Sequence, residues 1–293
     1  MSCLISSLIF ILCTISSQAI AAREQNQPVI ILYENNTKAY DTFKETIHQL
    51  QQLESQEIAP LIFIDSKEIS REKIMTQLRN ARAVVTLGNY SAQELASLQI
   101  KVSHIHALIT KENYQKLMPL NKTNTRNSCA LVIDQPLERI ISAAKKFIPN
   151  LQRIGIIIDS GNTADYDKHI QGSDIIYENL SNDIHSAITQ FADKSVDIIV
   201  ATQNSSIYNN ETARNILISS YHYNIPLVGY SESFVRAGAI LGVYSTPEMY
   251  AIDVYDLIKN PNNCTKNEIR YSSKFITKTN PQVASSLGIR FDN

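Results

Sequence analysis

The chain has 293 residues, of which 44% are hydrophobic and 19% are charged. This length and hydrophobic content suffice for one large domain or two lobes with buried cores, and they exclude global disorder. The formal net charge is −1 and only eight glycines occur. We therefore expect neither a basic nucleic-acid-binding surface nor a glycine-rich phosphate loop.

The N-terminal segment has the features of a secretory signal. An apolar run broken only by Ser and Thr spans Leu4 to Ile15, and Ala19-Ile20-Ala21 follows it. The small-x-small pattern is typical of a signal-peptidase site, and the run is too short to cross a membrane. We predict a signal peptide at residues 1–22, cleaved after Ala21 or Ala22. An uncleaved anchor is the alternative, because the n-region carries no Lys or Arg.

Short apolar runs then alternate with segments of helical periodicity. The first predicted strand starts at Pro28, and a helix follows it with Tyr40, Phe43, Ile47 and Leu50 on one face. Further strands are predicted at these runs: PLIFI from Pro60, AVVTL from Ala83, HALIT from His106, CALVI from Cys129, IGIII from Ile154, DIIY from Asp174 and DIIVA from Asp197. Near-continuous Ile and Val runs indicate strands covered on both faces, as in parallel sheets.

The repeated strand–helix units predict a doubly wound α/β fold. About ten strands are too many for one sheet of usual size, which favours two lobes. The polar segment Asn121 to Ser128 is a plausible crossing, and the loop-rich tail after Asn260 can cross back before a short helix from Gln282 to Leu287. We expect lobe 1 at residues 23–127 and 244–272, and lobe 2 at residues 128–243 and 273–293.

Two successive strands between Asp197 and Ser245 end in polar loops. The carboxyl ends of parallel strands form a crevice that binds small molecules. The polar residues at these ends are Thr202, Gln203, Asn204, Ser205, Tyr230, Ser231, Glu232, Tyr244 and Ser245. Because no nucleophile–base set accompanies them, the pattern indicates reversible binding without catalysis.

An internal similarity supports two lobes. Val84 to Leu95 and Ile198 to Asn209 share a plan of strand, Asn-containing loop and helix start. We predict that Ser91, and Ser205 or Ser206, are helix N-caps whose neighbouring N–H groups can meet a ligand. The alternative is a chance similarity, which any α/β chain can show.

Other candidate chemistry has a simpler interpretation. His104 and His106 lie two apart on a predicted strand without a third ligand nearby, so we interpret them as structural and expect no metal or cofactor. Glu34, Asp159 and Glu232 each follow a strand and fit either a cation-binding or a solvated loop carboxylate.

The remaining cysteines and the asparagine sequons bear on the compartment. Cys129 and Cys264 remain after the signal, and the count fits one disulfide or two free buried thiols. Two of the seven N-x-S/T sequons, at Asn89 and Asn204, lie in the proposed crevice. Because a glycan would block it, we favour a bacterial periplasm over a glycosylating compartment.

The order and spacing of several segments resemble the type I periplasmic binding proteins, specifically ABC-importer substrate-binding proteins of the branch typified by tryptophan-binding proteins. The segments that carry the resemblance are SVDIIVATQNSSIYNNETARNILISSYHYNIPLVGYSESFVRAGAILGVYS, VVTLGNYSAQEL, PLERIISAAKKFIPNLQRIGIII and NPQVASSLGI. Together they cover essentially the whole mature chain.

This resemblance implies an α/β fold of two Rossmann-like lobes with parallel sheets, joined by a three-crossing hinge that closes on a ligand. It implies a monomeric periplasmic solute-binding protein that captures a small polar or amino-acid-like ligand in an interlobe cleft and hands it to an inner-membrane ABC permease, with no nucleic-acid partner. The implied ligand contacts are Glu34, Asn35, Tyr40, Asn89, Tyr90, Ser91, Ser160, Asn162, Gln203, Asn204, Ser205, Ser231, Glu232 and Tyr244.

One departure bears on the ligand. The family commonly has Asp where this chain has Gln203, and that Asp would pair with a ligand ammonium. The departure favours a neutral ligand or a repurposed cleft. The alternative function is therefore a sensory or interaction module whose degenerate cleft signals to a membrane partner.

Overall fold

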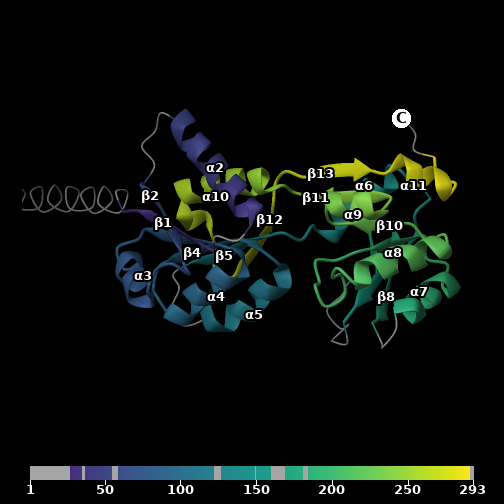
Figure 1. Cartoon of the computed structure of the whole chain (residues 1–293), viewed down its shortest axis with the longest axis horizontal. Coiled ribbons are helices and arrows are strands. Elements are labelled where there is room, and N and C mark those ends of the chain that lie inside the picture. Colours follow the sequence, from purple (N-terminus) through teal and green to yellow (C-terminus); the bar gives the residue numbers. More distant parts are fainter. Residues whose placement is uncertain are drawn as a thin grey trace, which may run out of the picture. The chain divides into compact units, whose positions relative to one another are not determined.

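The chain forms two compact units, each with one sheet and its own helices (Figure 1). The computed structural model describes residues 27–34, 37–54, 59–121, 127–148, 150–159, 169–180 and 184–290. The first unit contains the described residues up to Val132 together with Pro247–Arg270, and the second contains Ile133–Thr246 and the described residues from Tyr271. The chain therefore passes three times from one unit to the other.

The first unit has a six-stranded sheet in the order β12-β5-β4-β3-β1-β2. Its strands are β1 (Val29–Tyr33), β2 (Leu61–Asp65), β3 (Ala83–Leu87), β4 (Ser103–Ile109), β5 (Ser128–Val132) and β12 (Glu268–Tyr271). From β2 to β5 all neighbours pair in parallel. The helices are α2 (Lys38–Leu53), α3 (Arg71–Leu78), α4 (Gly88–Leu98), α5 (Lys111–Asn121) and α10 (Pro247–Lys259).

Helices cover both faces of this sheet, which is why its strands are apolar throughout. In Figure 1, α2 and α10 lie on one side, and α3, α4 and α5 lie on the other. Leu78 of α3 and Leu95 of α4 pack with Ile30 of β1 in one core cluster. On the opposite side α2 buries Phe43 and Ile47, two of the residues that define its predicted apolar face.

The second unit has a seven-stranded sheet in the order β13-β11-β10-β9-β6-β8-β7. Its strands are β6 (Arg153–Ile158), β7 (His169–Ile170), β8 (Ser173–Asn179), β9 (Ile198–Val200), β10 (Leu227–Gly229), β11 (Leu241–Tyr244) and β13 (Ile276–Thr279). From β8 to β11 all neighbours are parallel, whereas the edge strands β7 and β13 are antiparallel. The helices are α6 (Leu137–Lys145), α7 (Ile184–Asp193), α8 (Thr212–His222), α9 (Glu232–Ala237) and α11 (Pro281–Ser286).

Two separate core clusters lie in this unit, as expected for a sheet with helices on both faces. One cluster joins Ile141 of α6 and Ala284 of α11 to the strands. The other joins Phe191 of α7 and Ile216 of α8 to the opposite faces of the same strands. The predicted doubly wound α/β class with two parallel sheets is confirmed.

The lobe boundaries differ from those expected. The polar segment before Ser128 suggested a crossing there, but β5 pairs with β4 in the first sheet, so the chain leaves this unit only after Val132. A polar stretch marks a surface loop, and such a loop can join neighbouring strands as readily as domains. The return at Pro247 places α10 in the first unit. The predicted signal peptide, residues 1–22, lies outside the described residues.

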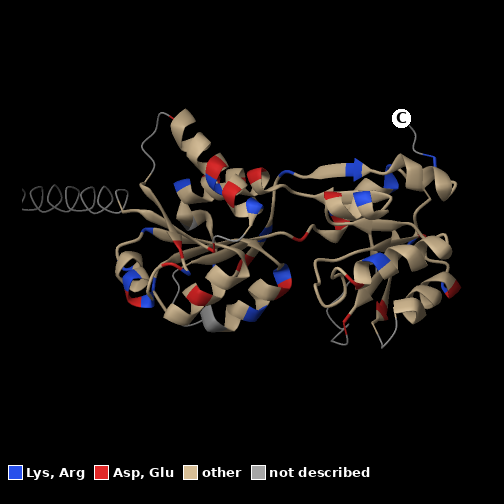
Figure 2. Ribbon diagram, viewed as in Figure 1, with Lys and Arg blue, Asp and Glu red and all other residues tan. Residues whose placement is uncertain are grey.

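The surface and the helices give two further findings. Acidic and basic residues are mixed over the elements of each unit (Figure 2), in keeping with 27 Lys and Arg against 28 Asp and Glu. Among the described helices, none combines the length and the hydropathy that a membrane span requires.

Candidate functional site

Each sheet has a topological switch point at the carboxyl end of its first parallel strand. In the first unit β1 lies between β2 and β3, and in the second unit β6 lies between β8 and β9. The chain therefore runs from the first strand to the neighbour on one side of it, and the next parallel strand then lies on the other side of the first strand. The connections diverge at that point and leave a crevice beyond the strand ends, where ligands of open α/β sheets bind.

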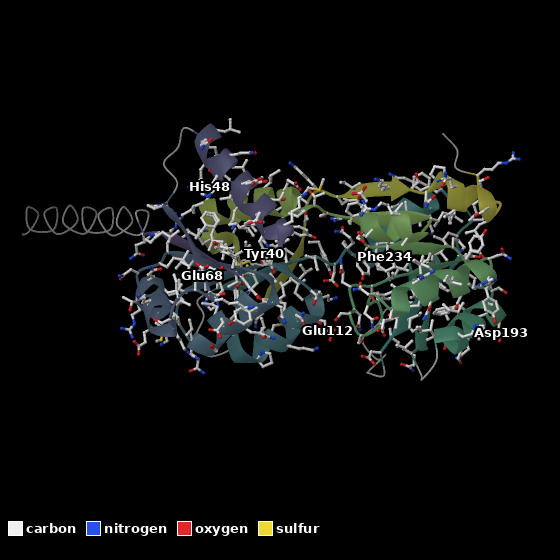
Figure 3. All side chains as sticks on the ribbon, in the orientation of Figure 1. Tyr40, His48, Glu68, Glu112, Asp193 and Phe234 are labelled. Atoms are coloured by element: carbon white, nitrogen blue, oxygen red, sulfur yellow. A yellow bond between two sulfur atoms is a disulfide. The ribbon has the colours of Figure 1, made fainter. Side chains whose placement is uncertain are left out.

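Tyr40 and Gly88 meet at the switch point of the first unit. Gly88 follows β3 with φ +80°, and a Cβ at this position would lie 1.9 Å from the Tyr40 hydroxyl oxygen. Tyr40, labelled in Figure 3, comes from the first turn of α2, which follows β1. Only glycine combines this backbone conformation with so close an approach. The connections after β1 and β3 are thus packed directly on each other.

Glu34 and Tyr90 flank this contact. Glu34 directly follows β1, its side chain is 14% exposed, and it forms an ion pair with Lys67. The Lys67 ammonium also lies 5.1 Å from the centroid of the Tyr90 ring, within the range of a cation–π interaction. Burial, and then the nearby Glu34 carboxylate, raise the pKa of Tyr40, so its phenol remains a neutral donor at pH 7.

Ser91 is buried behind the site and does not face solvent. Its side chain is fully buried, and its Oγ lies 3.4 Å from Ser66 Oγ, which donates to the Tyr33 carbonyl at 2.9 Å. The predicted N-cap role of Ser91 is wrong: α4 begins at Gly88, because the positive φ there turns the chain directly from strand into helix. Asn89 Oδ1 is buried without a hydrogen-bond partner among the described residues, which leaves an unused acceptor next to Gly88.

In the second unit, Asp159 after β6 meets the turn after β9. Ser206 Oγ lies 2.9 Å from Asp159 Oδ2 and 2.6 Å from Asn204 Oδ1. Asn204 Oδ1 also accepts from the Ser206 backbone N–H at 2.9 Å. One hydroxyl hydrogen therefore serves two acceptors, which leaves the cluster rich in acceptors. Gln203 and Ser205 flank Asn204 in the chain, the first half-buried and the second exposed.

The predicted N-cap at Ser205 or Ser206 is also wrong. The helix α8 begins only at Thr212. The residues between form a separate turn, in which the backbone N–H groups of Ile207 and Tyr208 donate to the Asn204 carbonyl. The side chains of Ile207 and Tyr208 are buried in the core, and this packing fixes the turn before the helix starts.

Ser231 and Glu232, which follow β10, have partners within the unit, and Tyr244 ends β11. Ser231 is the N-cap of α9, and its Oγ accepts from the Phe234 N–H at 3.3 Å. Glu232 forms an ion pair with Lys278 of β13, and this hydrogen bond lowers the pKa of the carboxyl group. Burial raises the pKa of Tyr244, and the nearby Glu232 adds to the shift.

Apart from the buried Ser91, the predicted contacts fall into three groups. Around the two switch points lie Glu34, Tyr40, Asn89, Tyr90, Gln203, Asn204 and Ser205. At the ends of the neighbouring strands β10 and β11 lie Ser231, Glu232 and Tyr244. Asn35, Ser160 and Asn162 lie outside the described residues. Ser66 and Lys67 were not predicted as site residues, although both directly follow the strand β2. Polar residues after the other parallel strands were predicted for that reason, and it applies equally to these two.

His104 and His106 are core residues of β4. Burial lowers their pKa values to about 4 and about 3, respectively. His106 Nδ1 is 2.8 Å from Thr86 Oγ1, whereas neither ring nitrogen of His104 has a hydrogen-bond partner among the described residues. No group of three or more His, Cys, Asp or Glu able to hold a metal ion occurs in the described part of the chain.

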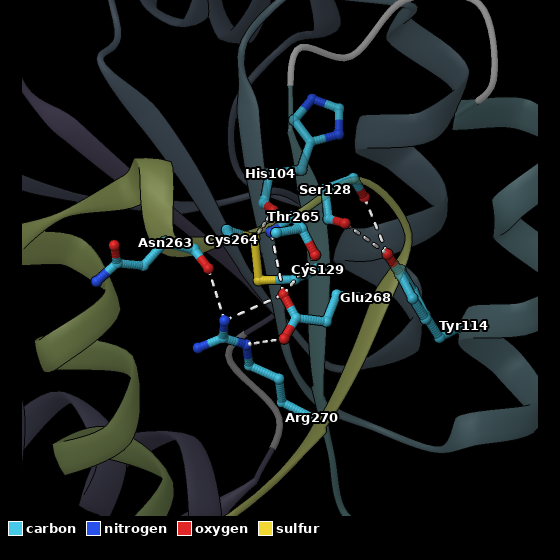
Figure 4. Close-up of polar contacts among 9 residues, drawn as sticks. All are labelled: His104, Tyr114, Ser128, Cys129, Asn263, Cys264, Thr265, Glu268 and Arg270. Carbon is cyan, nitrogen blue, oxygen red and sulfur yellow. Dashed lines mark hydrogen bonds and ion pairs between the residues drawn. A yellow bond between two sulfur atoms is a disulfide. The ribbon is translucent and has the colours of Figure 1, made fainter.

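Cys129 and Cys264 form a disulfide bond, so of the two alternatives the structure shows the bonded one (Figure 4). Both cysteines are fully buried. The bond ties β5 to the segment that leads into β12. Two residues of β12 hold the same segment, as Figure 4 shows. Glu268 accepts hydrogen bonds from the N–H and the hydroxyl of Thr265, and Arg270 donates to the Asn263 carbonyl.

Comparison with known proteins gives one family and several similar folds. Residues 38–250 match the family of ABC transporter substrate binding proteins. The ligand-free, open structure of a substrate binding protein with adhesive properties from Clostridium difficile has 10% identity and a TM-score of 0.63, with 90% of this chain and 95% of that chain covered. An ABC domain in complex with L-Trp from Streptococcus pneumonia has 18% identity and a TM-score of 0.53, with 90% and 96% covered.

A conserved domain protein from Vibrio cholerae has 16% identity and a TM-score of 0.54, with 91% of this chain and 96% of that chain covered. At these identities the likeness concerns the fold. No curated protein matched the chain.

Proposed function

Because the chain belongs to the ABC transporter substrate-binding protein family, we propose that it captures a small polar or amino-acid-like ligand for an importer and catalyses no reaction. The observation that carries the proposal is that hydrogen-bonding groups gather at the switch point of both sheets. Asn89 and Tyr90 lie there in the first unit, and Gln203 and Asn204 in the second. Such groups orient a small molecule and release it unchanged.

We propose that one ligand is bound by groups that belong to both units. A ligand that contacts groups of both units favours the conformation in which both reach it, and this is the physical basis of hinge closure. The proposed contacts are Glu34, Asn35, Tyr40, Asn89, Tyr90, Ser160, Asn162, Gln203, Asn204, Ser205, Ser231, Glu232 and Tyr244, with Ser91 as a supporting residue beneath them.

We further propose a periplasmic location after cleavage of residues 1–22, and an inner-membrane permease as partner of the monomeric protein. The disulfide between Cys129 and Cys264 supports this, because such bonds persist in oxidising compartments. The small–x–small motif that ends at Ala21 supports cleavage.

A thermal-shift screen of the chain from Arg23 onward, against metabolites, tests the proposal. A ligand at one hundred times its Kd should add about 2.7 kcal/mol to the free energy of unfolding. Gln203→Ala should weaken binding of that ligand about five- to tenfold, through loss of a hydrogen bond worth about 1 kcal/mol. Gln77→Ala, on the exposed surface of α3, is the control that should leave affinity unchanged.

If no metabolite in the screen stabilises the chain, the result contradicts capture of a small molecule. It then favours the alternative function, an interaction module. Unchanged affinity in Gln203→Ala would remove Gln203 from the proposed contacts.

A further inference from the structure

Lys67 fills a position between a carboxylate and an aromatic ring at the first switch point. We propose that Glu34 and Tyr90 form the binding site for a ligand ammonium group on a short alkyl chain, and that Lys67 is the internal occupant which this group displaces. The inference rests on the proposed function, since it names the chemical class of the ligand captured at the same site.

Three neighbouring strands bring the groups together. Glu34 follows β1, Lys67 follows β2 and Tyr90 lies in the first turn of α4 after β3. Because β1 is the middle strand of the three, Lys67 reaches across its carboxyl end to the Glu34 carboxylate. Its ammonium lies 5.1 Å from the centroid of the Tyr90 ring. A carboxylate and a ring face around one ammonium are the groups that recognise alkylammonium ligands.

The burial of the three side chains differs in a way that favours exchange. The Glu34 side chain is 14% exposed, whereas that of Lys67 is 55% exposed. A largely buried carboxylate needs a cation beside it, because desolvation of an unpaired charge is costly. The lysine side chain is already more than half exposed, so its ammonium returns to water at little cost, provided that another cation takes its place beside Glu34. Tyr90 is 39% exposed, so its ring can accept another group.

The backbone of Lys67 is anchored independently of its side chain. The Lys67 N–H donates to Asp65 Oδ1 at 2.9 Å, and the preceding Ser66 is bound to the Tyr33 carbonyl. The side chain can therefore leave Glu34 while the turn after β2 stays in place. The neutral Tyr40 phenol, whose pKa is raised by burial and then by Glu34, belongs to the same surroundings and can donate to the carboxylate or to the ligand.

Another lysine shows why exposure of the ring matters. Lys259 also pairs with carboxylates, those of Glu54 and Asp256, and lies 4.8 Å from the centroid of the Tyr255 ring. Tyr255, however, is only 2% exposed, and the group lies on α10 and at the C-terminal end of α2 instead of at strand ends. Its ring cannot be offered to a ligand, so Lys259 provides the matched control.

Gln203 and Glu34 together bear on the charge of the ligand. A neutral Gln203 in the second unit favours a ligand without an ammonium group only if no other acid is available. Glu34 is such an acid, and it lies in the first unit. The neutral Gln203 is therefore compatible with an amine on the ligand that Glu34 of the first unit recognises.

The test uses Lys67→Met, which keeps most of the stem and removes the charge, with n-butylammonium chloride as the probe. We expect the probe to bind this variant at least tenfold more tightly than the unsubstituted chain, measured by calorimetry and thermal shift. Butan-1-ol, the uncharged probe, should show no such gain. Glu34→Gln combined with Lys67→Met should lose the response to n-butylammonium, and Lys259→Met should behave as the unsubstituted chain does. Lys67→Gln repeats the test with a polar replacement.

Equal responses of Lys67→Met to the two probes, retention of binding in the double variant, or no response in either Lys67 variant would each overturn the proposal. Failure of the proposed function gives a different result. In that case no metabolite stabilises the unsubstituted chain. If a metabolite stabilises the unsubstituted chain and binds the Glu34→Gln variant with the same affinity, the proposed function stands. The proposed ammonium site is then contradicted.

Discussion

Gly88 shows how one residue fixes the geometry of the first switch point. Its φ of +80° is in the left-handed region, and the Tyr40 hydroxyl occupies the space of a Cβ. The two constraints are independent, since one concerns the backbone and the other the packing of α2 on the turn after β3. Substitution therefore disturbs the position of Tyr40 as well as the backbone.

Gly88→Ala should lower the free energy of unfolding by about 2–4 kcal/mol, from the left-handed strain and the overpacking together. Gly172→Ala is the matched control, because Gly172 has φ +74° with no atom within 4 Å of a Cβ. The control should show the backbone cost alone, about 1–2 kcal/mol. Urea unfolding of both variants gives the comparison. Equal losses of unfolding free energy in the two variants would mean that a Cβ at position 88 does not clash with Tyr40.

The two histidines of β4 make the stability of the first unit dependent on pH. Their folded-state pKa values, about 4 for His104 and about 3 for His106, lie below the ordinary value of 6.5. The unfolded chain therefore binds more protons than the folded chain at acidic pH. The stabilising contribution is fully present above pH 6.5 and is lost as the pH falls toward the folded-state values.

Between pH 6.5 and pH 4.5, each histidine should cost up to about 1.4 kcal/mol of stability per pH unit. His104→Phe should reduce this slope, and at pH 7.5 it should lose no hydrogen bond, because the ring nitrogens of His104 have no partner among the described residues. Urea unfolding at pH 7.5 and 5.0 measures the difference. The same slope in the variant and the unsubstituted chain would show that His104 does not titrate in this range.

At the scale of elements, β5 and β12 connect the first unit to the second. The chain leaves the first unit after Val132, at the end of β5, and again after Arg270, within β12. The disulfide between Cys129 and Cys264 joins the first of these strands to the segment before the second. Near two of the three connections, a covalent bond thus joins β5 to the segment that leads into β12.

Replacement of both cysteines by alanine should lower the free energy of unfolding by roughly 4–5 kcal/mol, the loop-entropy value for a closed loop of this size. The bond spans a sequence separation of 135 residues. Urea unfolding of the double variant, with and without reductant, is the measurement. Reductant should leave the variant unaffected, and a variant as stable as the oxidised chain would contradict the prediction.

The elements themselves were predicted with uneven success. AVVTL was predicted as a strand and forms β3 with the same bounds, because a fully buried strand needs an unbroken apolar run. The edge strands β12 and β13 lie in the tail that was predicted as loop-rich. Their side chains are largely half-buried or exposed, so their sequences carry no apolar run, and pairing with β5 and β11 decides their conformation.

At the scale of the whole molecule, the proposed hinge closure requires two units with separate cores, and the chain has them. Each unit has its own sheet and its own switch point. A ligand that contacts both units binds more tightly to the conformation in which both contacts form, and it therefore shifts the population toward that conformation.

We expect the ligand found in the screen to lower the radius of gyration of the chain, measured by small-angle X-ray scattering at saturation. Gln203→Ala at the same ligand concentration should show a smaller change, because less ligand is bound. An unchanged radius of gyration at full saturation would indicate that the ligand binds to one unit only.

The sequence by itself determined the α/β class, the positions of the buried strands and the polar residues that follow them. These features are local: an apolar run that is covered on both faces has to be buried, and the residues after it reach the edge of the sheet. Tertiary structure alone decided that β5 belongs to the first unit, that Ser91 is buried and that Lys67 lies between Glu34 and Tyr90. Each of these depends on which strands become neighbours, and contacts across the sheet leave no periodic pattern in the chain.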